Sequence, residues 1–168
     1  MNRLVLIGNG FDLSHGLKTS YSDFLHWYLK NVLESFIRDF KYNDNLIEVS
    51  SHFLSFDRSY PNFSSFESTL EVFVNLSKRN RQNGISFKYN SNFFKEIIDR
   101  ANQNLKWIDF ENHYFDYLKR YSEQIRYDAI HIKSFNNQFE YIKLKFEEYL
   151  KEITSKDFTQ KSTRFDYL

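Results

Sequence analysis

Residues near the N-terminus have the types and the spacing to bind a phosphate. Gly8 and Gly10 flank one asparagine directly after a short apolar run, and Gly16 follows. Glycine permits backbone angles and close approaches that a Cβ would block, so such a turn can point backbone N–H groups at a phosphate. The pattern predicts a nucleotide-binding loop whose binding residues are Gly8, Asn9, Gly10, Phe11, Asp12, Gly16 and Thr19.

Two carboxylates, Asp12 and Glu111, are the candidates for catalysis. Asp12 stands at the edge of the glycine loop. There it could accept a hydrogen bond from a ribose hydroxyl, position a water, or close an Asx turn on the loop itself. His15 lies beside the loop and could exchange protons near neutral pH, with a plain surface position as the alternative.

Glu111 interrupts an aromatic stripe. On a helix it lies four residues from both Trp107 and Phe115 and seven from Leu118, which places a carboxylate among apolar side chains. Burying an unpaired carboxylate is unfavourable, so it would need a partner or a raised pKa. Glu111 is therefore either a general acid or base, an acceptor for a ribose, or a structural group that holds the glycine loop by a salt bridge or hydrogen bond.

His113 does not extend this pattern into a metal site. On the same helix it falls on the polar face together with Lys106, Asp109 and Asp116. No second histidine accompanies it at the spacing of a metal ligand, so we predict no metal.

The glycine loop needs a strand before it and a helix after it. Residues 4–7 form a short apolar run with two β-branched members, which is typical of a buried parallel strand. Ser20 and Asp23 have the spacing of a capping box at the start of a helix. Asn9-Gly10 is also a strong signal for a two-residue β-hairpin, but residues 11–16 lack a clean return strand, which favours the loop.

The rest of the chain reads as mostly helical. Ser64 and Glu67 have capping-box spacing before one of these helices, and the apolar spacing fades after Thr154. Residues 84–89 and 130–132 are the two weaker candidates for partner strands. The predicted helices cover residues 21–42, 46–56, 64–73, 92–105, 107–127 and 135–153, with residues 77–92 the most loop-like.

Composition limits the class of protein. The 168 residues suit one domain, and 23 basic against 22 acidic residues leave a net charge of +1, which argues against a nucleic-acid partner. Cysteine is absent, which excludes disulfides and thiolate metal sites. No apolar run approaches the length of a membrane span, so we expect a cytoplasmic protein without a membrane partner.

Two segments resemble a known family. Ile-Gly-Asn-Gly-Phe-Asp-Leu at residues 7–13, with the following Gly-Leu, Thr, Tyr and Asp-Phe, resembles the N-terminal signature of the AbiH family of phage abortive infection proteins. Trp-Ile-Asp-Phe-Glu at residues 107–111 is similar to a second AbiH segment. The interval from Gly8 to Gly16 also resembles, more distantly, the NAD-binding loop of sirtuins.

The resemblance implies a fold class and a domain organisation. It implies an α/β fold, mostly helical, with an N-terminal parallel-type strand and glycine loop as an incomplete Rossmann-like or sirtuin-like core. AbiH proteins are usually longer and carry later Asn-Tyr-Thr and His-Gly motifs that do not occur here. We therefore expect residues 1–155 to be an AbiH-like domain that is the N-terminal portion of a longer fold, and residues 156–168 to be a loosely ordered tail.

The resemblance also implies a function. A phage-defence protein with a nucleotide, NAD being the candidate, in its glycine loop is the first hypothesis, and NAD glycohydrolase activity would require the missing C-terminal motifs. The second is a ribonuclease, because Arg126 and His131 fit the Arg-x4-His pattern of the all-helical HEPN ribonucleases. The third is a non-catalytic, truncated sensor that docks onto a partner subunit or forms a homo-oligomer.

Overall fold

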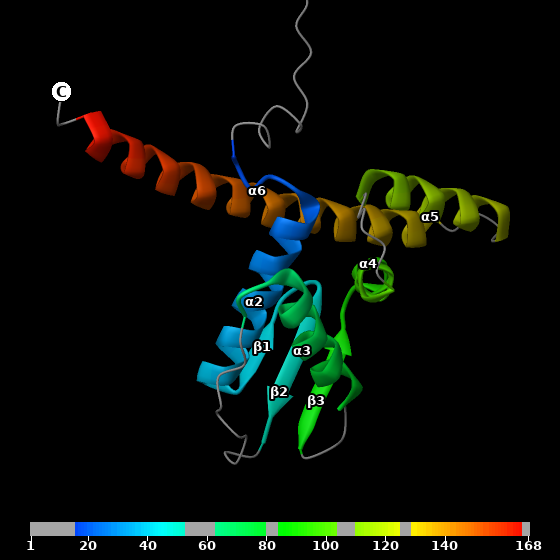
Figure 1. Ribbon diagram of the computed structural model, residues 1–168. Helices are drawn as coiled ribbons and strands as arrows, with labels where there is room; N and C mark the ends of the chain where they lie inside the picture. Colours follow the sequence, from blue (N-terminus) through cyan, green and yellow to red (C-terminus); the bar gives the residue numbers. More distant parts are fainter. Residues whose placement is uncertain (1–15, 53–62, 80–83, 104–109, 125–128, 166–168) are drawn as a thin grey trace, which may run out of the picture.

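The computed structural model describes residues 16–52, 63–79, 84–103, 110–124 and 129–165. Within these ranges helices cover one face of a small sheet, and the longest helix, α6, runs across one end with α5 alongside it (Figure 1). No helix among the described residues has both the length and the apolar character that crossing a membrane requires. The elements in order are α2 (Tyr21–Asp39), β1 (Lys41–Asn43), β2 (Ile47–Ser51), α3 (Phe66–Lys78), β3 (Ile85–Tyr89), α4 (Asn92–Asn102), α5 (Phe110–Gln124) and α6 (Ala129–Phe165).

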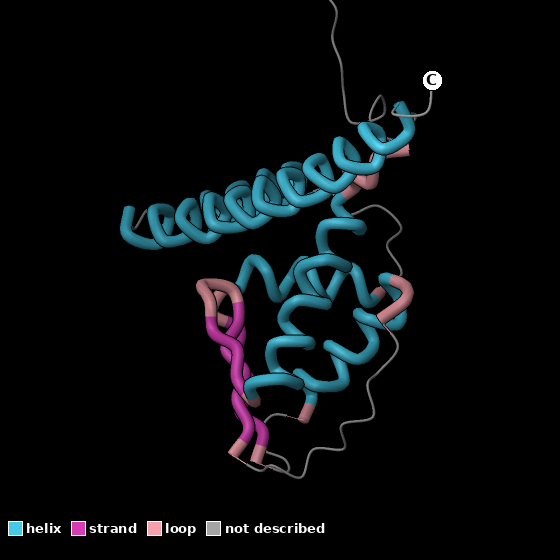
Figure 2. The backbone as a smooth tube through the Cα atoms, turned by 90° about the vertical axis from the view of Figure 1, so that its left-hand side faces the viewer, coloured by secondary structure: helices cyan, strands magenta, loops and turns pink. Residues whose placement is uncertain are grey.

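The sheet has three antiparallel strands in the order β1-β2-β3. Its side chains alternate: Ile47 and Val49 of β2 are buried, whereas Glu48 between them is exposed. β3 repeats the pattern with Ile85 and Phe87 buried. One face therefore packs against helices, as the edge-on view in Figure 2 shows, and the other face is polar.

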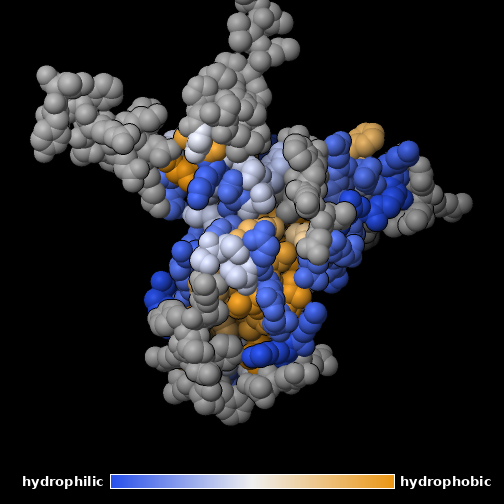
Figure 3. All heavy atoms as spheres, viewed as in Figure 1, coloured by the Kyte–Doolittle hydropathy of each residue, from blue (hydrophilic) through white to orange (hydrophobic). Residues whose placement is uncertain are grey.

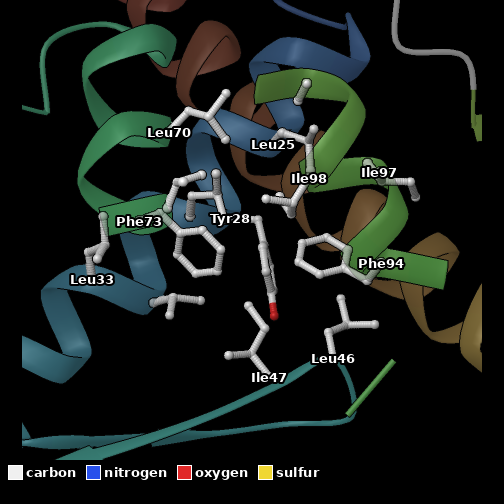
Figure 4. Packing of buried hydrophobic residues seen from close by; sticks show 14 of the residues in the cluster. Leu25, Tyr28, Leu33, Leu46, Ile47, Leu70, Phe73, Phe94, Ile97 and Ile98 are labelled. Atoms are coloured by element: carbon white, nitrogen blue, oxygen red, sulfur yellow. The ribbon is translucent and has the colours of Figure 1, made fainter. Parts of the chain in front are cut away.

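The core is built around α2. The ring of Tyr28 lies between Phe73 of α3 and Phe94 of α4, and its hydroxyl points at the sheet near Ile47 (Figure 4). Each fully buried apolar side chain of this kind contributes about 1.5–3 kcal/mol to stability. In Figure 3 hydrophobic residues show in the middle of the face below α6, framed by hydrophilic ones. The buried residues of α2 recur at helical spacing: Phe24, Leu25, Tyr28, Leu29, Val32, Leu33 and Phe36.

The helix predicted over residues 21–42 is shorter than expected. α2 ends at Asp39 because Phe40 adopts a left-handed conformation with φ 55°, and its N–H donates to the carbonyl of Phe36 at 2.8 Å. Such a cap stops a helix. The chain then forms β1, which pairs with β2.

The helix predicted over residues 46–56 is wrong in its described part, where β2 is a strand. The β-branched Ile47 and Val49 favour an extended chain, and both are buried on the face of the sheet that meets the helices. The candidate strand at 84–89 is confirmed as β3, within the stretch that was expected to be most loop-like. The other candidate, 130–132, lies in the helix α6.

The predicted helices over 92–105, 107–127 and 135–153 are confirmed as α4, α5 and α6 in their described parts. Helix α6 continues to Phe165, past the point where the apolar spacing fades. The capping box of α3 is shifted by one residue: Ser65, not Ser64, caps the helix, and its partner is Ser68.

The described residues do not support the predicted Rossmann-like or sirtuin-like core. Both strand pairs that the structure describes are antiparallel, whereas that core consists of parallel strands joined by crossover connections. The turn at Asp44 is short enough to join only antiparallel neighbours. The predicted parallel-type strand at residues 4–7 lies outside the described residues.

Candidate functional site

Two of the predicted nucleotide-binding residues, Gly16 and Thr19, lie among the described residues. Gly16 has a φ of 78°, and a Cβ placed there would meet no described atom within 4 Å. It is therefore the backbone conformation, not crowding, that favours glycine at this position. Thr19 is buried, and its N–H donates to the carbonyl of Leu17 at 3.1 Å. The other five, Gly8, Asn9, Gly10, Phe11 and Asp12, lie outside the described residues.

The N-terminus of α2 is capped by the side chain of the preceding residue. Ser20 is the N-cap: its Oγ accepts from the N–H of Asp23 at 3.1 Å and donates to the Asp23 carboxylate. The predicted N-cap is thus confirmed, and the second contact runs from the Ser20 hydroxyl to the Asp23 carboxylate. A carboxylate in the first turn already uses the favourable end of the helix dipole, so a phosphate arriving there would be repelled. This first turn therefore does not favour a phosphate.

Helix α6 contacts the end of the predicted nucleotide-binding stretch, residues 8–19, which we call the glycine segment. The hydroxyl of Tyr149 donates to the carbonyl of Lys18 at 2.5 Å, and the indole Nε1 of Trp27 donates to Glu152 at 2.8 Å. Burial raises the pKa of Tyr149, and the charges of Asp23 and Glu152 raise it further, so the phenol stays protonated at neutral pH. These bonds join positions more than a hundred residues apart in the sequence.

A largely apolar hollow of about 700 Å³ lies between α2 and α6, and we call it the apolar hollow. The ring of Phe146 lies 5.4 Å from that of Tyr21 and meets that of Phe24 edge-on at 5.2 Å. Ligand pockets typically have volumes of about 300–1,000 Å³. Hydrophobic surface along α6 is visible in Figure 3. The lining residues are Tyr21, Phe24, Phe139, Glu140, Ile142, Lys143, Leu144, Phe146, Glu147 and Leu150.

The charged lining residues of the apolar hollow belong to ion pairs along α6. Lys143 contacts Glu140 at 2.9 Å, and Glu147 contacts Lys151 at 2.7 Å. These exposed pairs leave the hollow without a strong net charge. Its first lining residue, Tyr21, follows Thr19 of the predicted nucleotide segment by two positions in the sequence.

The prediction that His113 lies on a polar face is wrong. The residue is 4% exposed, and its ring stacks on Phe93 with centroids 5.2 Å apart. Its Nε2 lies 3.4 Å from the carboxylate of Glu96, which also accepts from Arg120 at 2.9 Å. Burial lowers the pKa of His113, and the positive charge of Arg100 lowers it further. Helix α5 turns this residue inward because α4 packs against it.

The chemistry expected of Glu111 is not tested by the described side chains. The residue lies in α5, and its own side chain is outside the described part. One member of the aromatic stripe around it, Phe115, is 65% exposed, so the stripe is not buried throughout. Arg126 lies outside the described residues, and of His131 only the helical backbone in α6 is described. No group of three or more potential metal ligands occurs in the described ranges.

Sequence reasoning missed the most highly hydrogen-bonded carboxylate that the structure describes, Asp44. It accepts from the hydroxyls of Tyr28 at 2.9 Å and Tyr42 at 2.8 Å. It also accepts from the backbone N–H groups of Leu46 at 2.8 Å and Ile47 at 2.9 Å. The signal was present as an aspartate between two predicted helices, but only folding brings the two phenols to it.

The family comparison matches nearly the whole chain. The family model described as bacteriophage abortive infection AbiH matches residues 4–167. No curated protein and no solved structure matches, and the distant sirtuin-like resemblance has no support from these comparisons. The chain belongs to the AbiH family of bacteriophage abortive infection proteins.

Proposed function

We propose that this abortive infection protein binds a nucleotide, with NAD as the first candidate, at its N-terminal glycine segment. The apolar hollow is the observation that carries the proposal. Its lining begins at Tyr21, two residues after Thr19 in the sequence, it has the volume of a small-molecule pocket, and aromatic rings line it. A planar base or nicotinamide ring is the part of a nucleotide that such a lining favours.

The charge at the start of α2 indicates which groups would bind each part of the nucleotide. The first turn of α2 carries Asp23, so the phosphates would bind the backbone of Gly8, Asn9 and Gly10 instead. Asp12 would accept from a ribose hydroxyl. Tyr149 would act as a positioning residue, because its hydrogen bond to Lys18 holds the segment's exit against α6.

Binding is the activity proposed for this chain, and turnover is a separate measurement. Cleavage of the glycosidic bond of NAD would need an acid or base at the sugar, for which Asp12 and Glu111 are the candidates. Incubation with NAD and detection of released nicotinamide would measure it. Binding without release supports the present proposal, and release would extend it.

Calorimetry on the full chain tests the proposal. We expect NAD to bind the wild type and to bind Gly10→Val at least about tenfold more weakly, because the added side chain blocks the approach of a phosphate. Ser86→Val is the matched control: it places the same side chain at an exposed position of β3, where a strand tolerates it. Equal affinity of wild type and Gly10→Val, or no binding by the wild type, would contradict the proposal.

A further inference from the structure

We propose that a second, separate site binds an uncharged polyhydroxylated molecule, through the hydroxyls of a saccharide or of a ribose. The site is a hollow of about 660 Å³ where the β1–β2 turn, the end of β3 and the first turns of α6 meet, and we call it the polar hollow. It shares no lining residue with the apolar hollow. Five of its lining residues carry a carboxamide: Asn43, Asn45, Asn90, Asn137 and Gln138.

The chemistry of this lining matches hydroxyl groups. A carboxamide offers two N–H donors and an acceptor oxygen, and a sugar hydroxyl likewise donates one hydrogen bond and accepts others. Ser134 and Glu48 add a hydroxyl and a carboxylate. Neither lysine nor arginine lines the polar hollow, so phosphates and other anions find no charge partner there.

A divalent cation fits the polar hollow poorly. Calcium and magnesium take several oxygen ligands, usually including more than one carboxylate. Asp44 lines the hollow, but both of its carboxylate oxygens already accept two hydrogen bonds each. Among the described residues, that leaves Glu48 as the one carboxylate of the lining that makes no hydrogen bond.

Two of the carboxamides are held in fixed orientations. Gln138 accepts at 2.7 Å from the hydroxyl of Ser91, which is 0% exposed and also caps α4. Asn90 donates to the carbonyl of Asp44 at 2.7 Å. Gln138 thereby uses its acceptor oxygen within the protein and Asn90 uses its NH₂ donor, so the other group of each amide remains for a ligand. Holding these amides in place before binding reduces the side-chain entropy that is lost when a ligand binds.

Other groups of the polar hollow make no hydrogen bond to the part of the chain that the structure describes. Within the ranges that the structure describes, the side chains of Asn45, Glu48, Ser134 and Asn137 make no hydrogen bond. A ligand would therefore displace water from them without breaking contacts within the protein. Recognition of several adjacent hydroxyls requires donors and acceptors in fixed positions together with others that are free to pair. The polar hollow offers both kinds of group.

Side-chain amide NMR signals of the full chain provide the test. Maltotriose and adenosine are titrated separately, because one presents saccharide hydroxyls and the other a ribose. We expect the NH₂ signals of Asn45, Asn137 and Gln138 to shift with at least one of them, and that probe identifies the source of the hydroxyls.

Variants localise the binding. The double variant Glu48→Ala/Asn137→Ala removes two exposed side chains and should weaken the responding probe about tenfold or more. Asn75→Ala, an exposed position of α3, is the matched control and should leave the affinity unchanged. Gly10→Val should also leave it unchanged, which separates this site from the proposed nucleotide site.

Three results would overturn the proposal. One is the absence of shifts at these amides with both probes. Another is undiminished affinity in the double variant, which would place the binding elsewhere. The third is the same set of shifts with calcium chloride alone, which would make the polar hollow a cation site.

Discussion

At the scale of single residues, Asp44 decides how the first hairpin is attached to the core. Its carboxylate accepts from Tyr28 of α2 and Tyr42 of β1 as well as from its own turn. Burial raises the pKa of Tyr28, and the neighbouring negative charge of Asp44 raises it further. The phenol is therefore a permanent donor at neutral pH, and a carboxylate is the acceptor that it needs.

Replacing Asp44 by asparagine should destabilise the fold without changing its shape. The amide keeps one acceptor oxygen but puts an NH₂ where donors already point, so hydrogen bonds to a charged group are lost. We expect the free energy of unfolding to fall by about 2–3 kcal/mol, measured by urea denaturation.

Asp99→Asn is the control for this change. Asp99 makes an exposed ion pair with Lys95 along α4, and such pairs contribute little. If Asp44→Asn lowers the free energy of unfolding no more than Asp99→Asn does, the hairpin does not depend on the Asp44 carboxylate.

At the scale of elements, α6 connects parts of the chain that are far apart in sequence. Its first half packs on α5 and α4 through stacked rings such as Phe135 on Tyr117, with centroids 4.1 Å apart. Its second half carries Tyr149 and Glu152, which bond to the entry of α2. One helix therefore links the candidate nucleotide segment to the body of the protein.

Tyr149→Phe should release this connection. The substitution preserves the ring among Phe24, Trp27 and Phe146 but removes the donor to Lys18. We expect a loss of about 1 kcal/mol in the free energy of unfolding. If the glycine segment binds a nucleotide, NAD affinity measured by calorimetry should also fall, because the segment is no longer held in its binding conformation.

Tyr114→Phe serves as the matched variant, since its hydroxyl donates to Asn136 on the surface, away from α2. It should leave NAD affinity as in the wild type. Equal NAD affinity in wild type and Tyr149→Phe would remove Tyr149 from the nucleotide site while leaving its structural role intact.

At the scale of the whole molecule, stability should depend on pH through His113. Its pKa is lowered in the folded chain, so between the folded value and about 6.5 the unfolded chain binds more protons than the folded one. Folding is therefore favoured above about pH 6.5 and loses free energy as the pH falls toward the folded pKa. The charged groups around it are Glu96 and Arg100 of α4 and Asp116 and Arg120 of α5.

His113→Phe should flatten this dependence, because it keeps an aromatic ring against Phe93 and cannot be protonated. Denaturant unfolding at pH 5 and 7.5 measures how much the free energy of unfolding changes with pH. The change due to His113 is at most about 1.4 kcal/mol for each pH unit between its pKa values in the folded and the unfolded chain. The exposed His52→Gln is the control and should follow the wild type. The same pH dependence in His113→Phe and wild type would rule out His113 as its source.

Local features were predictable because neighbouring residues determine them. Helix α2 begins where Ser20 and Asp23 indicate, and the last helix shows its apolar face in the spacing of Phe139, Ile142 and Phe146. Capping and helical periodicity involve residues three or four positions apart, so the sequence displays them directly. The family resemblance, confined to short segments, was confirmed across residues 4–167.

Contacts between distant residues decided the rest. Residues 47–51 became a strand because β1 and β3 lie on either side of them, and His113 turned inward because α4 supplies Phe93. The two hollows also depend on where α6 crosses the molecule. The amino-acid order by itself determined most of the helices, the N-cap of α2 and the AbiH family. Only tertiary packing decided the antiparallel sheet, the partners of Asp44 and the placement of both hollows, because each requires surfaces that meet only after the chain has folded.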